Sequence, residues 1–157
     1  MIHEVASLVE MKSLASEIAS RLPQRALILL SGPMAAGKTQ FTKFLIEAMG
    51  QGPDSSDEVA RSPSFALHHS YLTARGSVEH FDLFRLENAD DLESIGFWDF
   101  FRDREGVIVI EWCERLREFG LEGSLPLNWP RIKIAIEPSA DSASVGAISQ
   151  RRRVSVD

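Results

Sequence analysis

One short segment constrains the fold of this chain more than any other: residues 32–39 read Gly-Pro-Met-Ala-Ala-Gly-Lys-Thr, just after an apolar run at 26–30. This is the complete G-x-x-x-x-G-K-[ST] pattern of a phosphate-binding loop. Such a loop joins a buried strand to a helix and turns several backbone N–H groups towards phosphate oxygens. The segment therefore predicts ATP or GTP binding where the strand meets the helix.

The residues after the loop have the spacing of an amphipathic helix, which Gly50 then stops. Its apolar positions at i, i+3, i+4 and i+7 are Phe41, Phe44, Leu45 and Ala48. We expect Lys38 and the Thr39 hydroxyl to serve the terminal phosphates and Mg²⁺. The alternative is a glycine-containing turn between two core elements, with Lys38 merely solvated.

The composition is that of one globular domain. The chain has 157 residues, 44% hydrophobic and 25% charged, which suffices for a single core. No run approaches the roughly 20 apolar residues of a membrane span, and Glu4, Glu10 and Glu17 argue against a signal peptide. The lone Cys113 excludes an internal disulfide framework and fits a reducing compartment. We therefore expect one domain over 1–157, located in the cytoplasm.

The net charge of −6 and the pI of about 5.2 limit the class of partner. Nucleic-acid affinity comes largely from Lys and Arg side chains that neutralise phosphates, so broad nucleic-acid binding is not expected. We expect neither DNA nor a membrane as a partner. The basic run at 151–153 either forms a solvated edge that discourages strand pairing or faces a ligand.

The remaining strands are predicted from short apolar or alternating runs at 64–71, 77–83, 107–110, 131–136 and 152–156. The first two flank the turn signal Arg75-Gly76 and so predict a β-hairpin. Because 107–110 is continuously apolar, it is expected in a parallel sheet and buried on both faces. Together these runs predict an α/β, P-loop NTPase-like three-layer fold. Its central sheet is mostly parallel, with an inserted β-hairpin and antiparallel C-terminal strands.

Two further helices are expected, one over 5–22 and a short one starting at Asp90, where acidic residues favour a helix N-terminus. The first is expected to cover one face of the sheet. The aromatic cluster that follows the second helix is expected in the core: Phe97, Trp98, Phe100 and Phe101.

Two carboxylates complete a candidate catalytic set with Lys38. Glu111 ends the apolar strand at 107–110, where carboxylates of nucleotide-binding folds meet Mg²⁺ directly or through water. Asp82 lies opposite its apolar neighbours and on the same strand face as His80, in a position to orient water near the γ-phosphate. The alternatives are a surface carboxylate at a strand end for Glu111 and a solvent-facing strand position for Asp82.

Residues 62–65, Ser-Pro-Ser-Phe, precede the hairpin and carry two hydroxyl groups. They form either a simple turn or a switch that becomes ordered when γ-phosphate and Mg²⁺ bind.

Taken in order, these motifs resemble the TsaE (YjeE) family, the small ATPase of bacterial tRNA threonylcarbamoyladenosine biosynthesis. The resemblance spans nearly the whole chain and rests on the order and spacing of the motifs. After the phosphate loop come residues 62–65, His-Phe-Asp-Leu-Phe-Arg at 80–85, Ile95-Gly96 with Asp-Phe-Phe at 99–101, and Glu111-Trp112.

The resemblance implies ATP binding and slow hydrolysis, with Thr39 and Glu111 as Mg²⁺ ligands and Asp82 supporting hydrolysis. It assigns phosphate contacts to residues 35–40. With Gly32 of the loop motif, the cofactor-binding candidates are Gly32, Ala35, Ala36, Gly37, Lys38, Thr39 and Gln40. It also implies TsaB- and TsaD-like partners, whose complex transfers a threonylcarbamoyl group to an adenosine of tRNAs that read ANN codons. The tRNA is then bound chiefly by the partners. Trp112 matches the family's tryptophan and packs either near the nucleotide or partner, or in the core.

The phosphate loop departs from the family pattern. The family usually has Leu-Gly-Ala-Gly-Lys-Thr, whereas residues 34–39 read Met-Ala-Ala-Gly-Lys-Thr, and Pro33 stands where an acid is common. Ala35 puts a β-carbon where the backbone normally approaches phosphate closely, so affinity or turnover is expected to differ. Phe84 replaces a tyrosine and Cys113 a proline. None of these changes removes a proposed ligand.

Two other functions fit the same loop. A small-molecule kinase shares the loop and the size, although residues 114–119 are a weak candidate for its arginine-bearing lid and no acceptor site is evident. A nucleotide-gated binding module with negligible turnover fits the departure at Ala35.

Overall fold

The computed structural model describes residues 1–50, 67–102, 105–139 and 151–157. Its strands are β1 (Ile2–Val5), β2 (Arg25–Ser31), β3 (His68–Thr73), β4 (Gly76–Asp82), β5 (Gly106–Glu111), β6 (Arg131–Pro138) and β7 (Arg152–Val156). They form one seven-stranded sheet in the order β1-β7-β6-β2-β5-β4-β3. The switch region expected at 62–65 lies outside the described residues.

The sheet is parallel at its centre and antiparallel at its edges. The strands β6, β2, β5 and β4 pair in parallel. The hairpin partner β3 runs antiparallel to β4, and β7 runs antiparallel between β6 and β1. As predicted, residues 107–110 are buried at the centre of the sheet. The second strand of the expected hairpin is itself a member of the parallel core.

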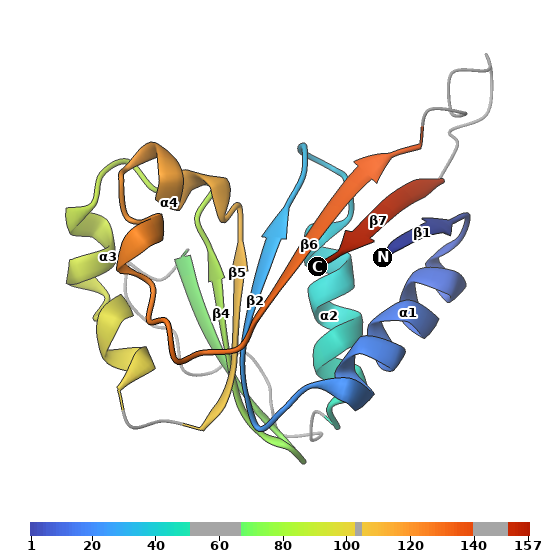
Figure 1. Ribbon diagram of the computed structural model, residues 1–157, viewed down its shortest axis with the longest axis horizontal. Helices are drawn as coiled ribbons and strands as arrows, with labels where there is room; N and C mark the ends of the chain where they lie inside the picture. Colours follow the sequence, from blue (N-terminus) through green and yellow to red (C-terminus); the bar gives the residue numbers. More distant parts are fainter. Residues whose placement is uncertain (51–66, 103–104, 140–150) are drawn as a thin grey trace.

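The helices are α1 (Leu8–Arg21), α2 (Lys38–Ala48), α3 (Asp90–Ser94) and α4 (Glu114–Glu118), with 3-10 turns η2 (Phe97–Phe101) and η3 (Glu122–Ser124). Figure 1 shows α1 and α2 on one side of the sheet and α3 and α4 on the other. The predicted three-layer α/β architecture is therefore confirmed. Within the described residues, no helix has the length and apolar character needed to cross a bilayer.

The N-terminal segment differs from the sequence prediction, which began a helix at residue 5. The structure instead has the strand β1, whose last residue, Val5, is buried. The helix α1 begins later because the Ser7 hydroxyl accepts a hydrogen bond from the Glu10 N–H at 3.2 Å and caps it. The partner of β1 is β7, at the other end of the chain.

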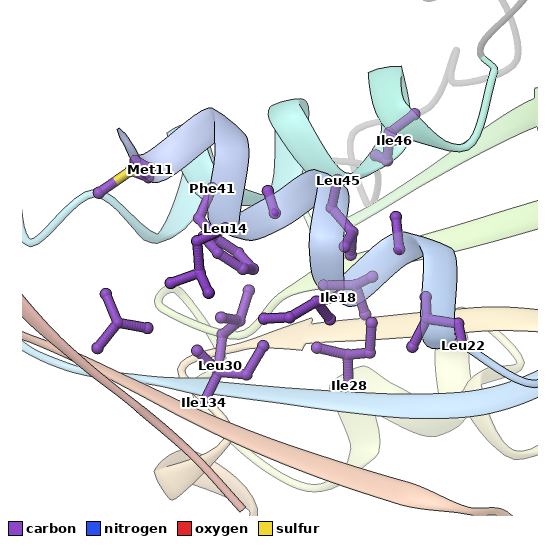
Figure 2. Close-up of a cluster of buried hydrophobic side chains, with 14 of the residues drawn as sticks. Met11, Leu14, Ile18, Leu22, Ile28, Leu30, Phe41, Leu45, Ile46 and Ile134 are labelled. Carbon is purple, nitrogen blue, oxygen red and sulfur yellow. The ribbon is translucent and has the colours of Figure 1, made fainter. Parts of the chain in front are cut away.

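The helices α1 and α2 pack against the sheet through an apolar core. Figure 2 shows side chains from both helices meeting those of β2 and β6: Met11, Leu14, Ile18, Leu22, Ile28, Leu30, Phe41, Leu45, Ile46 and Ile134. The guanidinium of Arg75, in the hairpin turn, donates to the carbonyls of Ala19 and Leu22 and so closes the C-terminal end of α1. This packing fixes α2 with its N-terminus at the carboxyl end of β2.

The opposite face carries the aromatic cluster predicted from the sequence. Phe97 and Phe101 are buried, whereas Trp98 and Phe100 are half-buried at the margin of the same cluster. All four rings thus belong to the core cluster or pack against it, as expected, and two of them are fully buried. Phe100 lies against His68 of the edge strand β3 and Phe81 of β4.

Candidate functional site

A cavity of about 340 Å³ lies at the carboxyl ends of β2, β5 and β4. The described residues that line it come from the phosphate loop, from α2 and from the ends of β4 and β5: Met34, Ala35, Gly37, Lys38, Thr39, Gln40, Asp82, Phe84, Glu111 and Trp112. Asp82 and Glu111 are direct neighbours in the register of β4 and β5. The parallel sheet thus places both predicted carboxylates beside the loop.

The conformation of the loop depends on its two glycines. Gly32 has φ +136°, and a β-carbon there would lie 2.1 Å from the carbonyl oxygen of Ile136 in β6. Gly37 has φ +109° directly before α2. Both positions need glycine because side chains are disfavoured in this region of φ. Ala35 also has a positive φ, +61°, although it carries a β-carbon.

Lys38 is 5% exposed and holds the loop closed. Its Nζ donates to the carbonyls of Gly32 at 2.6 Å and Pro33 at 2.8 Å, and it lies 3.8 Å from the centre of the Trp112 ring. Burial lowers the pKa of the Lys38 ammonium, while the negative charges of Glu111, Glu114 and Asp82 oppose this shift. The Lys38 ammonium thus lies at the mouth of the loop, bound to two neutral backbone carbonyls that phosphate oxygens can replace.

Glu111 is 1% exposed and receives three side-chain hydrogen bonds. Thr39 Oγ1 donates to Oε2 at 2.9 Å, Thr42 Oγ1 donates to Oε1 at 3.0 Å, and His80 Nε2 lies 2.8 Å from Oε1. Burial alone would raise the pKa of this carboxyl, but the hydrogen bond and charge of His80 and the two hydroxyls outweigh it and lower the pKa. Glu111 is therefore held as a carboxylate.

Asp82 is half-buried and lines the same cavity. Its Oδ1 accepts a hydrogen bond from the Phe84 N–H at 3.0 Å, which turns the chain after β4. Within the described residues no side chain donates to it. Its carboxylate is accordingly open to water in the cavity.

Most of the candidate site residues line the cavity, and two of them do not. Of the cofactor-binding candidates, those at the cavity wall are Ala35, Gly37, Lys38, Thr39 and Gln40. Gly32 packs against Ile136, and Ala36 is buried in the core, with its N–H bonded to the Pro33 carbonyl at 3.2 Å. Neither is among the described residues that line the cavity. Direct ligand contact by these residues stays a prediction.

Sequence reasoning missed two polar contacts of Glu111. Thr42 lies one helical turn after Thr39, so the i, i+3 spacing of the two hydroxyls was the available signal. His80 was placed on the same strand face as Asp82, but its contact with Glu111 depends on how β4 pairs with β5. That pairing is not local in the sequence.

The oxygen atoms beside the loop suit Mg²⁺. The Thr39 hydroxyl and the Glu111 carboxylate are hard oxygen donors, and Mg²⁺ in nucleotide sites takes only one or two protein ligands besides phosphates and waters. Within the described residues there is no group of three His, Cys, Asp or Glu side chains that forms a self-contained metal site. The donor set therefore fits a metal that arrives with a nucleotide.

A strand, a glycine-bearing loop, a helix N-terminus and a strand-end carboxylate bonded to the loop threonine define a P-loop NTPase-like α/β protein. The same fold occurs in the crystal structure of Bacillus subtilis YdiB, with a TM-score of 0.61 and 22% identity over 98% of this chain and 82% of that one. The family model for "Threonylcarbamoyl adenosine biosynthesis protein TsaE" matches residues 5–145, and the chain belongs to the TsaE family.

Relatives from several bacteria carry the name "tRNA threonylcarbamoyladenosine biosynthesis protein TsaE". The protein of Aquifex aeolicus is 39% identical over 65% of this chain and 68% of its own length. That of Haemophilus influenzae is 32% identical over 57% of this chain, and the match spans about half, 52%, of its length. The resemblance seen in the order of the motifs is thereby confirmed.

Proposed function

We propose that this protein binds and hydrolyses ATP with Mg²⁺, acting with TsaB- and TsaD-like proteins in tRNA threonylcarbamoyladenosine formation. The observation that carries the proposal is the 2.9 Å hydrogen bond between Thr39 and Glu111 inside the cavity beside the phosphate loop. This contact joins the loop to the end of β5, as a metal-dependent nucleotide site requires.

The loop residues would bind the phosphates. The N-terminus of α2 offers backbone N–H groups to an anion, and Lys38 exchanges its bonds to the Gly32 and Pro33 carbonyls for phosphate oxygens. Thr39 and Glu111 would hold Mg²⁺, which when bound neutralises charge on the β- and γ-phosphates.

Asp82 is proposed to orient the attacking water and to accept its proton. Its carboxylate accepts a proton as the water oxygen attacks the γ-phosphorus and the bond to the β-phosphate oxygen breaks. The Phe84 N–H holds Oδ1 of Asp82, and the side chain lines the cavity. Turnover is proposed to be slow without the partners, as the resemblance to the TsaE family implies.

The partners and the compartment follow from the family and the charge. A chain with net charge −6 is poorly suited to bind tRNA itself, so we propose that the TsaB- and TsaD-like proteins bind it. We further propose that residues 1–157 act as one domain and that the complex forms in the cytoplasm.

The kinase alternative gains no support from the residues proposed as its lid. In α4, Arg115 donates to the Leu86 carbonyl and pairs with Glu118, and Arg117 pairs with Glu122. Both guanidinium groups are therefore engaged by other residues, and neither is among the described residues that line the cavity beside the phosphate loop. The nucleotide-gated binding module differs from the main proposal only in turnover.

The test is ATP hydrolysis by the protein reconstituted with TsaB and TsaD. Lys38→Ala, Glu111→Ala and Asp82→Ala are each expected to lower turnover by at least about 100-fold. Glu93→Gln, an exposed change on α3, serves as the matched control and should leave turnover unchanged. Wild-type rates in all three site variants would overturn the assignment. Nucleotide-dependent partner binding without measurable hydrolysis in the wild type would favour the binding module.

A further inference from the structure

The Glu111 carboxylate is oriented by its hydrogen bonds. Each of its oxygens has two acceptor directions. At Oε1 both are taken, by Thr42 Oγ1 at 3.0 Å and His80 Nε2 at 2.8 Å, whereas Oε2 accepts from Thr39 alone among the described residues. One acceptor direction therefore remains, on the oxygen that also contacts the loop threonine.

His80 is well placed to fix this orientation without touching a ligand. Its side chain is 8% exposed, and it is not among the described residues that line the cavity. It comes from β4, two residues before Asp82, and β4 pairs with β5 in the register that brings Asp82 beside Glu111. Because a carboxylate only accepts hydrogen bonds, Nε2 must carry the hydrogen.

The other nitrogen of the ring shows that this contact is specific. His80 Nδ1 is buried and has no hydrogen-bond partner within the described residues. An unpaired buried nitrogen costs about 1–3 kcal/mol, so a ring kept only for packing would be better replaced by an apolar side chain. The bond to Glu111 is the one hydrogen bond that the imidazole makes within the described residues.

We propose that His80 is a positioning residue for the metal and nucleotide site: with Thr42 it saturates Glu111 Oε1 and thereby directs Oε2 to the cation. This inference rests on the proposed function, because it assumes that Glu111 meets Mg²⁺. Partners of metal-ligating carboxylates typically affect metal affinity by about 10- to 100-fold when they are removed.

The test compares variants of His80 that differ in how far the hydrogen-bond donor lies from the backbone. A Gln side chain places its amide nitrogen near the position of Nε2, whereas an Asn amide stops near the position of Nδ1. Both are neutral and polar, so H80Q should keep the hydrogen bond to Glu111 and H80N should lose it. H80L removes the donor altogether, and H69L is the control on the opposite strand, since His69 pairs with His80 across β3 and β4.

The readout is the affinity for a non-hydrolysable ATP analogue, measured by calorimetry with Mg²⁺ and with EDTA. We expect H80N and H80L to bind about 10- to 100-fold more weakly with Mg²⁺ and unchanged in EDTA. H80Q and H69L should match the wild type in both conditions. A purely structural role would lower the affinity with Mg²⁺ and in EDTA together. Circular dichroism identifies a variant that is not folded. If H80L is not folded, the result for H80N decides.

The outcomes separate this inference from the function on which it rests. Mg²⁺ is expected to raise the affinity for the ATP analogue. If Glu111→Ala abolishes this increase but H80N and H80L retain it, the role of His80 is wrong and the metal site stands. If Mg²⁺ does not raise the affinity of the wild type, both the role of His80 and the proposed metal site are overturned. If H80Q fails like H80N, the hydrogen bond at the Nε2 position is not the operative feature, and the inference is wrong.

Discussion

The ends of β5 and β4 lie side by side in the sheet, yet the carboxylates that they carry are held very differently. Glu111, at the end of β5, is almost completely buried and accepts from three side chains. Asp82, at the end of β4, is half-buried and accepts from the backbone N–H of Phe84. One sheet edge thus supplies both a carboxylate fixed in one orientation and a carboxylate open to water, which suits ligation and proton transfer respectively.

The largest effect that tests this comparison is expected at the open carboxylate. Asp82→Asn keeps the shape and removes the proton acceptor, so ATP turnover with TsaB and TsaD should fall by about 10²- to 10⁴-fold. Because few groups depend on Asp82, the free energy of unfolding in urea should change by less than about 0.5 kcal/mol. Loss of stability without loss of turnover would contradict the role proposed for Asp82.

Replacing the fixed carboxylate should lower stability as well as turnover. Glu111→Gln places an amide among three donors, so at pH 7 the free energy of unfolding should fall by about 1–3 kcal/mol. Glu93→Gln on α3 is the exposed control and should leave stability unchanged.

The stability difference at Glu111 should also depend on pH. The pKa of this carboxyl is lower in the folded protein than its ordinary value of 4.5. Its stabilising contribution is therefore complete above that value and is lost as the pH falls through the folded pKa. Urea unfolding at a series of pH values should show the wild type and Glu111→Gln converging on acidification. Curves that stay equally far apart would mean that the hydrogen bonds do not depend on the charge.

The smallest effect is expected in the loop that faces both carboxylates. Ala35 has φ +61°, a conformation that costs an L-residue about 1–2 kcal/mol, whereas glycine adopts it freely. Glycine also loses more entropy on folding, so Ala35→Gly should stabilise the protein by less than about 1 kcal/mol. Calorimetry should show tighter ATP binding, since the loop backbone can approach phosphate more closely. Weaker ATP binding by Ala35→Gly would show that the β-carbon of Ala35 contributes to nucleotide affinity.

Local patterns in the sequence were sufficient for the framework of the site. Strand, loop and helix at 26–50 and the buried strand at 107–110 follow from short-range periodicity, and they bring Lys38, Thr39 and Glu111 together. The strand β1 was missed because its four residues are short, mixed in polarity and paired with β7. Such a distant partner leaves no local signal.

The finer arrangement of the site depends on features that a sequence pattern does not encode. The contact of His80 with Glu111 needs the register of β4 on β5, and the burial of Ala36 needs the three-dimensional turn of the loop. Trp112 has φ +57°, an uncommon conformation for a bulky side chain, and it brings the ring beneath Lys38. Each of these follows from tertiary packing rather than from residue spacing.

The hydrogen bonds of the Arg75 guanidinium bear on local unfolding of the sheet edge. Because it bonds the hairpin turn to the last carbonyls of α1, we expect an edge of the sheet and a helix that are distant in sequence to unfold as one cooperative unit. Local opening of β3 and β4 then also releases the end of α1. The strand that carries His80 and Asp82 is in this way protected from fraying at the end opposite to the cavity.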